Sequence, residues 1–190
     1  MSDLLLGIDI GTTNVKAVLA TPQGEVVASA QHAYDISFPR QGWAEQNPHD
    51  WWTGTVETTR RVLQQADPRR VRAIGVSGQG CAVTLIDRAG DVIRPAIIWM
   101  DSRSEPQCQQ MRDCCADRIL ETNGKSPAPY NADPALMWLS VHEPSSIERA
   151  TVSLTSTAYI NHRLTGEAVA NVSDASILFA FDLAKSDWSD

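Results

Sequence analysis

A glycine–threonine turn near the amino terminus carries residue types that could bind phosphate. Residues 7–16 read GIDIGTTNVK. Gly11 has no Cβ, so the backbone could turn tightly and approach a ligand there, and the amides and hydroxyls of Thr12 and Thr13 could donate to phosphate oxygens. Asp9 ends an apolar run in which an unpaired buried carboxylate would be costly. We expect Asp9 to face away from its isoleucine neighbours and to hold Mg²⁺ through water.

The alternative for this stretch is a plain β-hairpin in which Asp9 pairs with Lys16. Walker A spacing is absent, and so is the Rossmann glycine pattern, because Gly75, Gly78 and Gly80 are wrongly spaced. A nucleotide site here would therefore belong to another class of ATPase. We include Lys16 in that candidate Mg-ATP site.

The elements that position this turn alternate between strands and tight turns. Apolar runs at 4–10, 15–20 and 25–34 predict three antiparallel strands, and residues 21–24 (TPQG) suit a type I turn. Asn47 and Pro48 then predict the start of a helix, whose apolar stripe continues to about residue 66.

Further α/β units follow in the second part of the chain. We expect a strand at 71–76, a hairpin of 81–87 with 92–99, a helix from a Ser102–Glu105 capping box to about 118, a helix at 134–141, a strand at 151–154 and a helix at 157–164. This order predicts an α/β architecture with a mixed sheet, not the strict alternation of a doubly wound fold.

Composition and charge exclude several classes of protein. The chain has 190 residues and a formal net charge of −7, which argues against non-specific nucleic-acid binding. It has no run near the ~18 apolar residues of a membrane span, and its start does not read as a secretory signal. The four cysteines have no metal-ligand spacing. We therefore expect reduced thiols in a cytoplasmic protein without a membrane or nucleic-acid partner.

Longer stretches resemble the FGGY carbohydrate kinases of the actin, sugar-kinase and heat-shock ATPase superfamily. The opening LLLGIDIGTTNVKAVLATPQGEVVASAQ is similar to the start of that superfamily, and PRQGWAEQNPHDWW resembles the FGGY Pro-x-x-Gly-Trp-x-Glu-x-(Asn/Asp)-Pro pattern. IGVSGQGCAVTLID and RPAIIWMDSR resemble the strands that line the sugar pocket, and SDASILFAFDLAKSDWSD the segment before the hinge. The resemblance implies an actin-like ATPase (ribonuclease H-like) domain over residues 1–190, with a mixed five-stranded sheet flanked by helices.

The same resemblance implies that Gln79, Gly80 and Cys81 line a sugar site. Xylulokinase-like members read Gly-Gln-Met-His-Gly here, so a histidine has become a cysteine, which is a weak hydrogen-bonding partner. A pentulose such as xylulose is the first expectation, although L-xylulose and erythritol kinases are closer at this spot. The alternative is that Cys81 is only a small strand residue.

The family's Trp-x-Asp-x-Arg motif matches Trp99, Asp101 and Arg103. Asp101 could accept hydrogen bonds from two sugar hydroxyls, while Arg103 pairs with it and keeps it ionised. Alternatively, Asp101 caps the next helix and Arg103 is exposed. Trp99 could be an apolar wall for the sugar or part of the core. A lysine of the family signature is replaced by Ala135, which we expect to remove a structural or pocket-edge contact rather than the chemistry.

The resemblance implies phosphorylation of a sugar or polyol by ATP with Mg²⁺. It also implies that the catalytic base, the adenosine pocket and the carboxy-terminal domain lie beyond residue 190, so we expect no catalytic residue and no turnover in this chain alone. Two other hypotheses remain: a non-catalytic sugar-binding or regulatory module, and a scaffold or chaperone-like ATPase, against which the tryptophan pattern argues. An apolar face left exposed would favour a homodimer.

Overall fold

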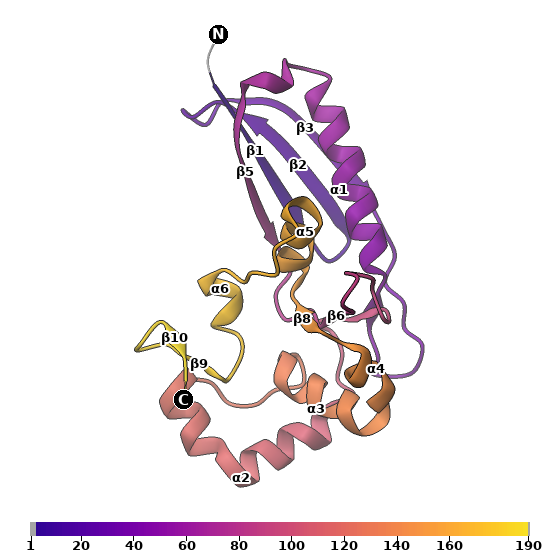
Figure 1. Ribbon diagram of the computed structural model, residues 1–190, viewed down its shortest axis with the longest axis vertical. Helices are drawn as coiled ribbons and strands as arrows, with labels where there is room; N and C mark the ends of the chain where they lie inside the picture. Colours follow the sequence, from indigo (N-terminus) through magenta and orange to yellow (C-terminus); the bar gives the residue numbers. More distant parts are fainter. Residues whose placement is uncertain (1–2, 190) are drawn as a thin grey trace.

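A four-stranded mixed sheet forms the upper lobe of the molecule (Figure 1). The computed structural model describes residues 3–189. Strands β1 (Leu4–Ile10), β2 (Asn14–Ala20) and β3 (Val26–Ala33) are antiparallel neighbours, and β5 (Val71–Gly78) pairs with β1 in parallel. The predicted meander and the mixed sheet flanked by helices are confirmed. The sheet has four strands in the described residues, not five, because the later strands pair with other partners.

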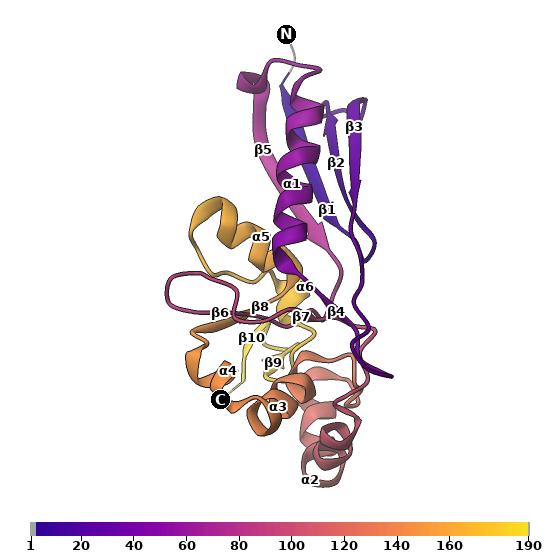
Figure 2. The same ribbon diagram turned by 90° about the vertical axis from the view of Figure 1, so that its right-hand side faces the viewer.

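One face of this sheet is covered by helices and the other is open. Helices α1 (Pro48–Leu63) and α5 (Ser156–Thr165) pack against the covered face (Figure 2). Asp9 is exposed on the open face, whereas its neighbours Ile8 and Ile10 are buried, as strand alternation predicted. The main core lies between the sheet and the two helices and includes Leu4, Leu6, Ile8, Ile10, Val15, Ala17, Leu19, Trp51, Tyr159 and Ile160.

Helix α1 begins where the sequence predicted. The Asn47 side chain accepts a hydrogen bond from the amide of His49 at 3.1 Å, which satisfies one of the orphan donors at the helix start. Gly54 allows the helix to lie close to the sheet, since a Cβ there would be 3.1 Å from a methyl of Val15. The helix ends at Leu63, three residues before the expected end.

The lower lobe consists of short helices and two-stranded ribbons (Figure 2). Its second apolar cluster contains Ala135, which is 2% exposed, so the position of the family lysine is here part of the core. The helices are α2 (Glu105–Asn123), α3 (Ala132–His142), α4 (Pro144–Arg149) and α6 (Val172–Ala175); a 3₁₀ turn, η1 (Pro68–Arg70), lies in the upper lobe between α1 and β5. The ribbons pair β4 (Glu45–Gln46) with β7 (Ala96–Ile97), β6 (Thr84–Ile86) with β8 (Val152–Leu154), and β9 (Phe181–Asp182) with β10 (Asp187–Trp188).

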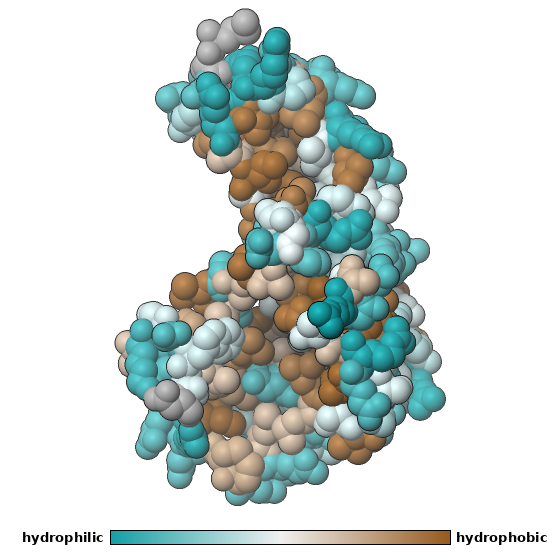
Figure 3. All heavy atoms as spheres, viewed as in Figure 1, coloured by the Kyte–Doolittle hydropathy of each residue, from teal (hydrophilic) through white to brown (hydrophobic). Residues whose placement is uncertain are grey.

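One local prediction for the lower lobe was wrong, and another was confirmed only in part. Helix α2 begins at Glu105 after an N-cap at Ser104, not at a capping box, because the Ser102 hydroxyl hydrogen-bonds with the carbonyl of Gly42 instead. The predicted hairpin of 81–87 with 92–99 is present but irregular. Its arms pair antiparallel through bridges between Val83 and Ile97 and between Ile86 and Val92, while β6 and β7 each form a ladder with a different strand. Figure 3 shows a notch between the lobes, with apolar side chains at the surface on both sides of it.

Within residues 3–189, no helix is long and apolar enough to span a membrane.

The junction between the lobes depends on Gly78, and a pair of glycine substitutions tests this. A Cβ on Gly78 would lie 2.6 Å from the Ser156 hydroxyl and 3.2 Å from the Ile10 carbonyl. Ser156 is fully buried and cannot swing away. We expect Gly78→Ala to lower the free energy of unfolding by about 1–3 kcal/mol through overpacking, as measured by urea titration.

The matched control is Gly75→Ala on the same strand. A Cβ at Gly75 would contact nothing within 4 Å. We expect this change to alter stability by no more than about 0.5 kcal/mol. Equal effects of the two substitutions would contradict the close packing of Gly78 against α5.

Candidate functional site

The glycine–threonine turn joins β1 to β2 at the lower end of the sheet. The Gly11 amide donates to the Asn14 carbonyl at 3.0 Å, and a Cβ on Gly11 would lie 3.1 Å from that same oxygen. The predicted tight turn is therefore present. Asp9 lies opposite Lys16 in the strand register. Both side chains lie on exposed positions, so they are accessible from the open face of the sheet.

The carbonyl groups of this turn accept hydrogen bonds, whereas two of its amide groups have no partner among the described residues. The Thr13 carbonyl accepts from the Tyr34 amide at 3.1 Å, and the Tyr34 hydroxyl donates to the Gly11 carbonyl. Burial, with a smaller effect of Asp9, raises the pKa of Tyr34, so it stays a donor. Among the described residues, the amides of Thr12 and Thr13 make no hydrogen bond. The turn thus has two unpaired donors, which is what a phosphate site of the predicted kind needs.

Gln46 ties this turn to the second group of candidate residues. Its Nε2 donates to the Thr12 carbonyl at 2.7 Å. Its Oε1 accepts from Trp51 Nε1 at 3.2 Å and from Gln79 Nε2 at 2.7 Å. The side chain is 2% exposed, and a buried amide with these partners has little freedom to move. Gln46 was not predicted as a site residue; the one indication in the sequence was its place in the GWAEQNP stretch.

Gln79 has a buried oxygen without a partner. The residue is 8% exposed, and its Oε1 makes no hydrogen bond among the described residues. Its backbone is fixed, because the amide donates to the Ile10 carbonyl at 2.7 Å and the carbonyl accepts from the Ser156 hydroxyl at 2.9 Å. A buried acceptor left unpaired is costly. Gln79 Oε1 is itself buried, so it is a candidate acceptor for a ligand hydroxyl only if its side chain moves toward the open space beside Gly80.

The two residues after Gln79 form the bend at the end of β5. A Cβ on Gly80 would contact nothing within 4 Å, so there is open space beside it. Cys81 has a φ of 57°, in the left-handed region that residues with a Cβ rarely adopt. Burial raises the pKa of its thiol. The Cys81 side chain is therefore a neutral, weakly polar group held in a strained bend.

Trp99 makes a second connection to the phosphate turn. Its indole Nε1 donates to the Thr12 hydroxyl at 3.0 Å, while 47% of the residue is exposed. Of the two alternatives for Trp99, core packing does not fit this exposure. The structure thus brings together residues from four segments of the chain: Thr12, Gln46, Gln79 and Trp99.

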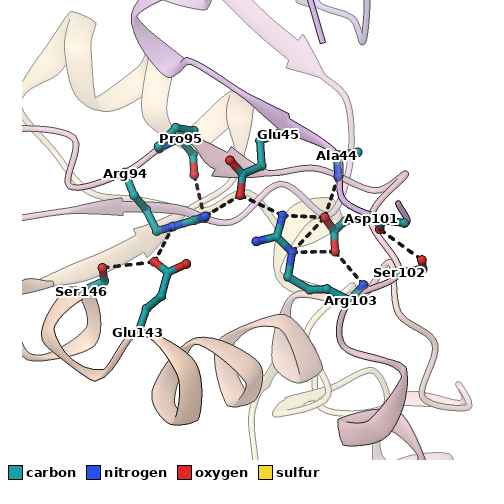
Figure 4. A network of polar contacts seen from close by, with 10 residues as sticks. Ala44, Glu45, Arg94, Pro95, Asp101, Ser102, Arg103, Glu143 and Ser146 are labelled. Atoms are coloured by element: carbon teal, nitrogen blue, oxygen red, sulfur yellow. Dashed lines mark hydrogen bonds and ion pairs between the residues drawn. The ribbon is translucent and has the colours of Figure 1, made fainter. Parts of the chain in front are cut away.

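Asp101 and Arg103 form a buried ion pair that contacts Glu45, the neighbour of Gln46 in the chain (Figure 4). Arg103 NH2 is 2.7 Å from Asp101 Oδ2, and the Ala44 amide donates to that oxygen, also at 2.7 Å. Asp101 Oδ1 accepts from the Arg103 amide at 2.9 Å. Both side chains are 1% exposed. The predicted ion pair is present, but in this arrangement Asp101 has no surface that a sugar could contact, and Arg103 is not exposed.

Glu45 connects this ion pair to a second arginine. Its Oε1 accepts from Arg103 NH2 at 2.8 Å and from Arg94 NH2 at 2.5 Å, and Arg94 Nε donates to Glu143 at 2.9 Å (Figure 4). The guanidinium of Arg103 also stacks 3.7 Å from the ring centroid of Trp43. This network anchors the loop that carries Gln46.

The carboxylates of the described residues can be compared with the ligands that Mg²⁺ requires. Within residues 3–189, no group of three or more His, Cys, Asp or Glu side chains could hold a metal ion. Magnesium, however, is usually held by one or two carboxylates together with water and phosphate. The exposed carboxylate of Asp9 beside two unpaired amides fits that arrangement.

The buried charge network predicts a large effect of removing Glu45. Glu45→Ala leaves Arg94 and Arg103 without a shared acceptor, and breaking a buried pair costs about 3–5 kcal/mol. We expect the free energy of unfolding, measured by chemical denaturation, to fall by that amount. The matched control is Glu57→Ala, since Glu57 also has two partners, His32 and Arg61, but its side chain is 43% exposed.

For Glu57→Ala we expect a loss of about 1 kcal/mol or less. Similar losses for the two variants would contradict the structural role of the Glu45 network.

Comparison with known proteins assigns the chain to a family. Residues 4–190 match the N-terminal domain of the FGGY family of carbohydrate kinases. The xylulose kinase of Klebsiella pneumoniae is 38% identical over 189 residues, and a glycerol kinase of Methylobacterium nodulans is 32% identical over 200 residues. These matches cover 98% and 100% of this chain but only 38% and 40% of the two relatives.

Solved structures agree with the sequence comparison. The crystal structure of a xylulose kinase from Rhodospirillum rubrum matches with a TM-score of 0.91 at 31% identity, covering 96% of this chain and 39% of that one. The actin-like ATPase fold inferred from the sequence resemblance is thereby confirmed. The chain belongs to the FGGY family of carbohydrate kinases, and residues 4–190 correspond to the family's N-terminal domain.

Proposed function

We propose that the protein phosphorylates a sugar or polyol with ATP, and that its substrate is a pentulose such as xylulose. The observation that carries this proposal is the hydrogen-bonded chain from the Thr12 carbonyl through Gln46 to Gln79. It places unpaired backbone donors, suited to phosphate, next to an unpaired side-chain acceptor, suited to a hydroxyl. Transfer of a phosphoryl group to an alcohol needs these two kinds of group close together.

At the phosphate end, the residues of the turn bind and orient. The amides of Thr12 and Thr13 donate to phosphate oxygens, and Lys16 adds positive charge on the open face of the sheet. Asp9 would hold Mg²⁺ through water. When bound, this ion would offset negative charge on the phosphate oxygens. Tyr34 and Gln46 keep the carbonyls of the turn occupied, so that its donors point toward the anion.

At the sugar end, Gln79 accepts a hydrogen bond from a substrate hydroxyl and Trp99 covers the apolar C–H face. Gly80 leaves room for the ligand, and Cys81 contributes only a weak polar contact. We propose that Asp101 and Arg103 position the loop around Ala44 rather than touch the sugar, since their side chains are 1% exposed.

The catalytic base is proposed to lie outside residues 1–190. The chain spans 38% of the length of the xylulose kinase that it resembles, so much of a complete kinase has no counterpart in it. In this proposal, residues 1–190 bind both substrates and turnover needs the remainder. A protein that binds xylulose but never transfers phosphate in full-length form would instead be a sugar-binding module.

Titration calorimetry with D-xylulose tests the role of Gln79. Gln79→Met keeps the length of the side chain but removes both the unpaired Oε1 and the Nε2 that donates to Gln46. Losing one hydrogen bond to a neutral group costs about 1–2 kcal/mol, so we expect the Kd of the full-length protein to rise about 5- to 30-fold. L-xylulose and erythritol, titrated alongside, identify the preferred substrate class.

The control is Gln65→Met, the same change at an exposed position after α1. It should leave the Kd for xylulose unchanged. If Gln79→Met and Gln65→Met bind xylulose equally well, Gln79 is not a substrate ligand.

A further inference from the structure

Two adjacent residues at the start of α5 contact two different segments of the chain. Thr155 is the N-cap of α5 and Ser156 is the first residue of the helix, which lies against β5 at the junction between the lobes (Figure 1). The Ser156 hydroxyl donates to the Gln79 carbonyl at 2.9 Å. The Thr155 hydroxyl donates to Asp174 Oδ2 at 2.7 Å. The start of α5 therefore connects the bend at residues 79–81 with helix α6, which carries Asp174.

The contact with the bend is buried and close. A Cβ on Gly78 would lie 2.6 Å from the Ser156 hydroxyl oxygen, so the end of β5 and the start of the helix leave no room for a further atom. Ser156 is fully buried, and its hydroxyl is the partner of the Gln79 carbonyl. A shift of α5 away from the bend would leave that carbonyl unpaired, which is costly. The start of α5 therefore fixes the Gln79 backbone.

Thr155 uses its hydroxyl both as an acceptor and as a donor. The oxygen accepts from the Ala158 amide at 3.2 Å, which caps the helix, and the proton is donated to Asp174. The Asp174 carboxylate thus lies at the N-terminal end of α5, where the helix dipole favours negative charge. The Asp174 amide donates to the Asn171 side chain at 2.8 Å, which caps α6. Asp174 therefore links the first turns of α5 and α6.

Residues 174–183 are in turn fixed to the end of helix α2. The fully buried side chain of Asn123 donates through Nδ2 to three carbonyls of this segment, those of residues 176, 178 and 181, at 3.1, 2.9 and 2.9 Å. The Leu183 amide donates to the Thr122 carbonyl at 3.0 Å. Segment 174–183 is therefore anchored to the lower lobe, and Asp174 with it.

We propose that Thr155, Ser156 and Asp174 are positioning residues that couple the bend after β5 to segment 174–183. The inference rests on the proposed role of Gln79 in sugar binding. Because Gln79 Oε1 is buried, a sugar hydroxyl reaches it only when the side chain turns, while the Ser156 contact holds the backbone in place. Asp174 holds the start of α5 through Thr155, so the position of its segment determines how well the bend fits the sugar. Such coupling is reciprocal, so sugar binding also steadies the segment.

The alkylation rate of Cys81 with iodoacetamide measures this link without any sugar. Cys81 lies in the bend and is half-buried, so the rate, followed by peptide mass spectrometry on the full-length protein, reports how firmly the bend is held. Asp174→Ala removes the acceptor of the Thr155 hydroxyl and leaves the cap on Ala158 intact. Ser156→Ala removes the other contact. We expect each variant to react about 5-fold faster than its control, or more, which is the lower end of typical coupling between sites.

Each of these variants has a matched control. Asp174→Asn removes the same negative charge, which adds to the effect of burial in raising the pKa of the Cys81 thiol, but its side-chain oxygen still accepts from Thr155. Thr165→Ala removes a hydroxyl from the other, exposed end of α5. Equal alkylation rates in Asp174→Ala and Asp174→Asn, or in Ser156→Ala and Thr165→Ala, would overturn the link.

Titration calorimetry with D-xylulose separates this inference from the proposed function. We expect the Kd of Asp174→Ala to be about 5-fold higher than that of Asp174→Asn, or more, because a bend that is held less firmly is less preorganised for the sugar. Equal Kd values would overturn the coupling. If the wild type does not bind D-xylulose, the proposed function fails and the coupling to sugar with it, whereas the Cys81 rates still decide whether the start of α5 holds the bend.

Discussion

The buried amide of Gln46 is the interaction on which the candidate site depends. One side chain donates to the carbonyl of Thr12 and accepts from Gln79 and Trp51. These partners come from the first turn, the end of β5 and helix α1, so three separate segments meet at one buried group. Because an unsatisfied buried polar group is costly, each partner constrains the others. The glycine–threonine turn and the end of β5 at Gln79 are therefore connected through one buried side chain.

The buried charged side chains around Glu45 hold β4, and with it Gln46, in place. Glu45 immediately precedes Gln46 and accepts from Arg94 and Arg103, which in turn is paired with Asp101. Buried ion pairs contribute little net stability, but leaving one partner alone is expensive. The network consequently fixes where β4 lies more than it strengthens the fold. Residues in the FGGY family motif can thus act by positioning, one layer below the surface that a substrate would contact.

Local patterns predicted the elements well and the long-range contacts poorly. Alternation and turn residues were sufficient for the meander of β1 to β3, and Asn47 with Pro48 was sufficient for the start of α1. Asp101 was expected to contact a sugar or to cap a helix; its hydrogen bond with the Ala44 amide, 57 positions away, has no signal in the sequence. No sequence spacing marks Gln46 as a partner of Gln79, 33 positions away. Helix α2 is also broken at Cys115, where φ is −150°, without a glycine or proline to mark the place.

The most direct test of the account is the affinity of the full-length protein for xylulose with and without a non-hydrolysable ATP analogue. If Gln46 links the two sites, nucleotide should tighten sugar binding by about 1–3 kcal/mol of coupling free energy. In Gln46→Glu, the side chain can still accept from Trp51 and Gln79, and in its ionised form it cannot donate to the Thr12 carbonyl. Burial favours the protonated form, so the variant is measured at a pH high enough to ionise it. The account predicts that this folded variant binds xylulose while the coupling falls close to zero, with Gln65→Glu unaffected. Full coupling in Gln46→Glu would contradict it.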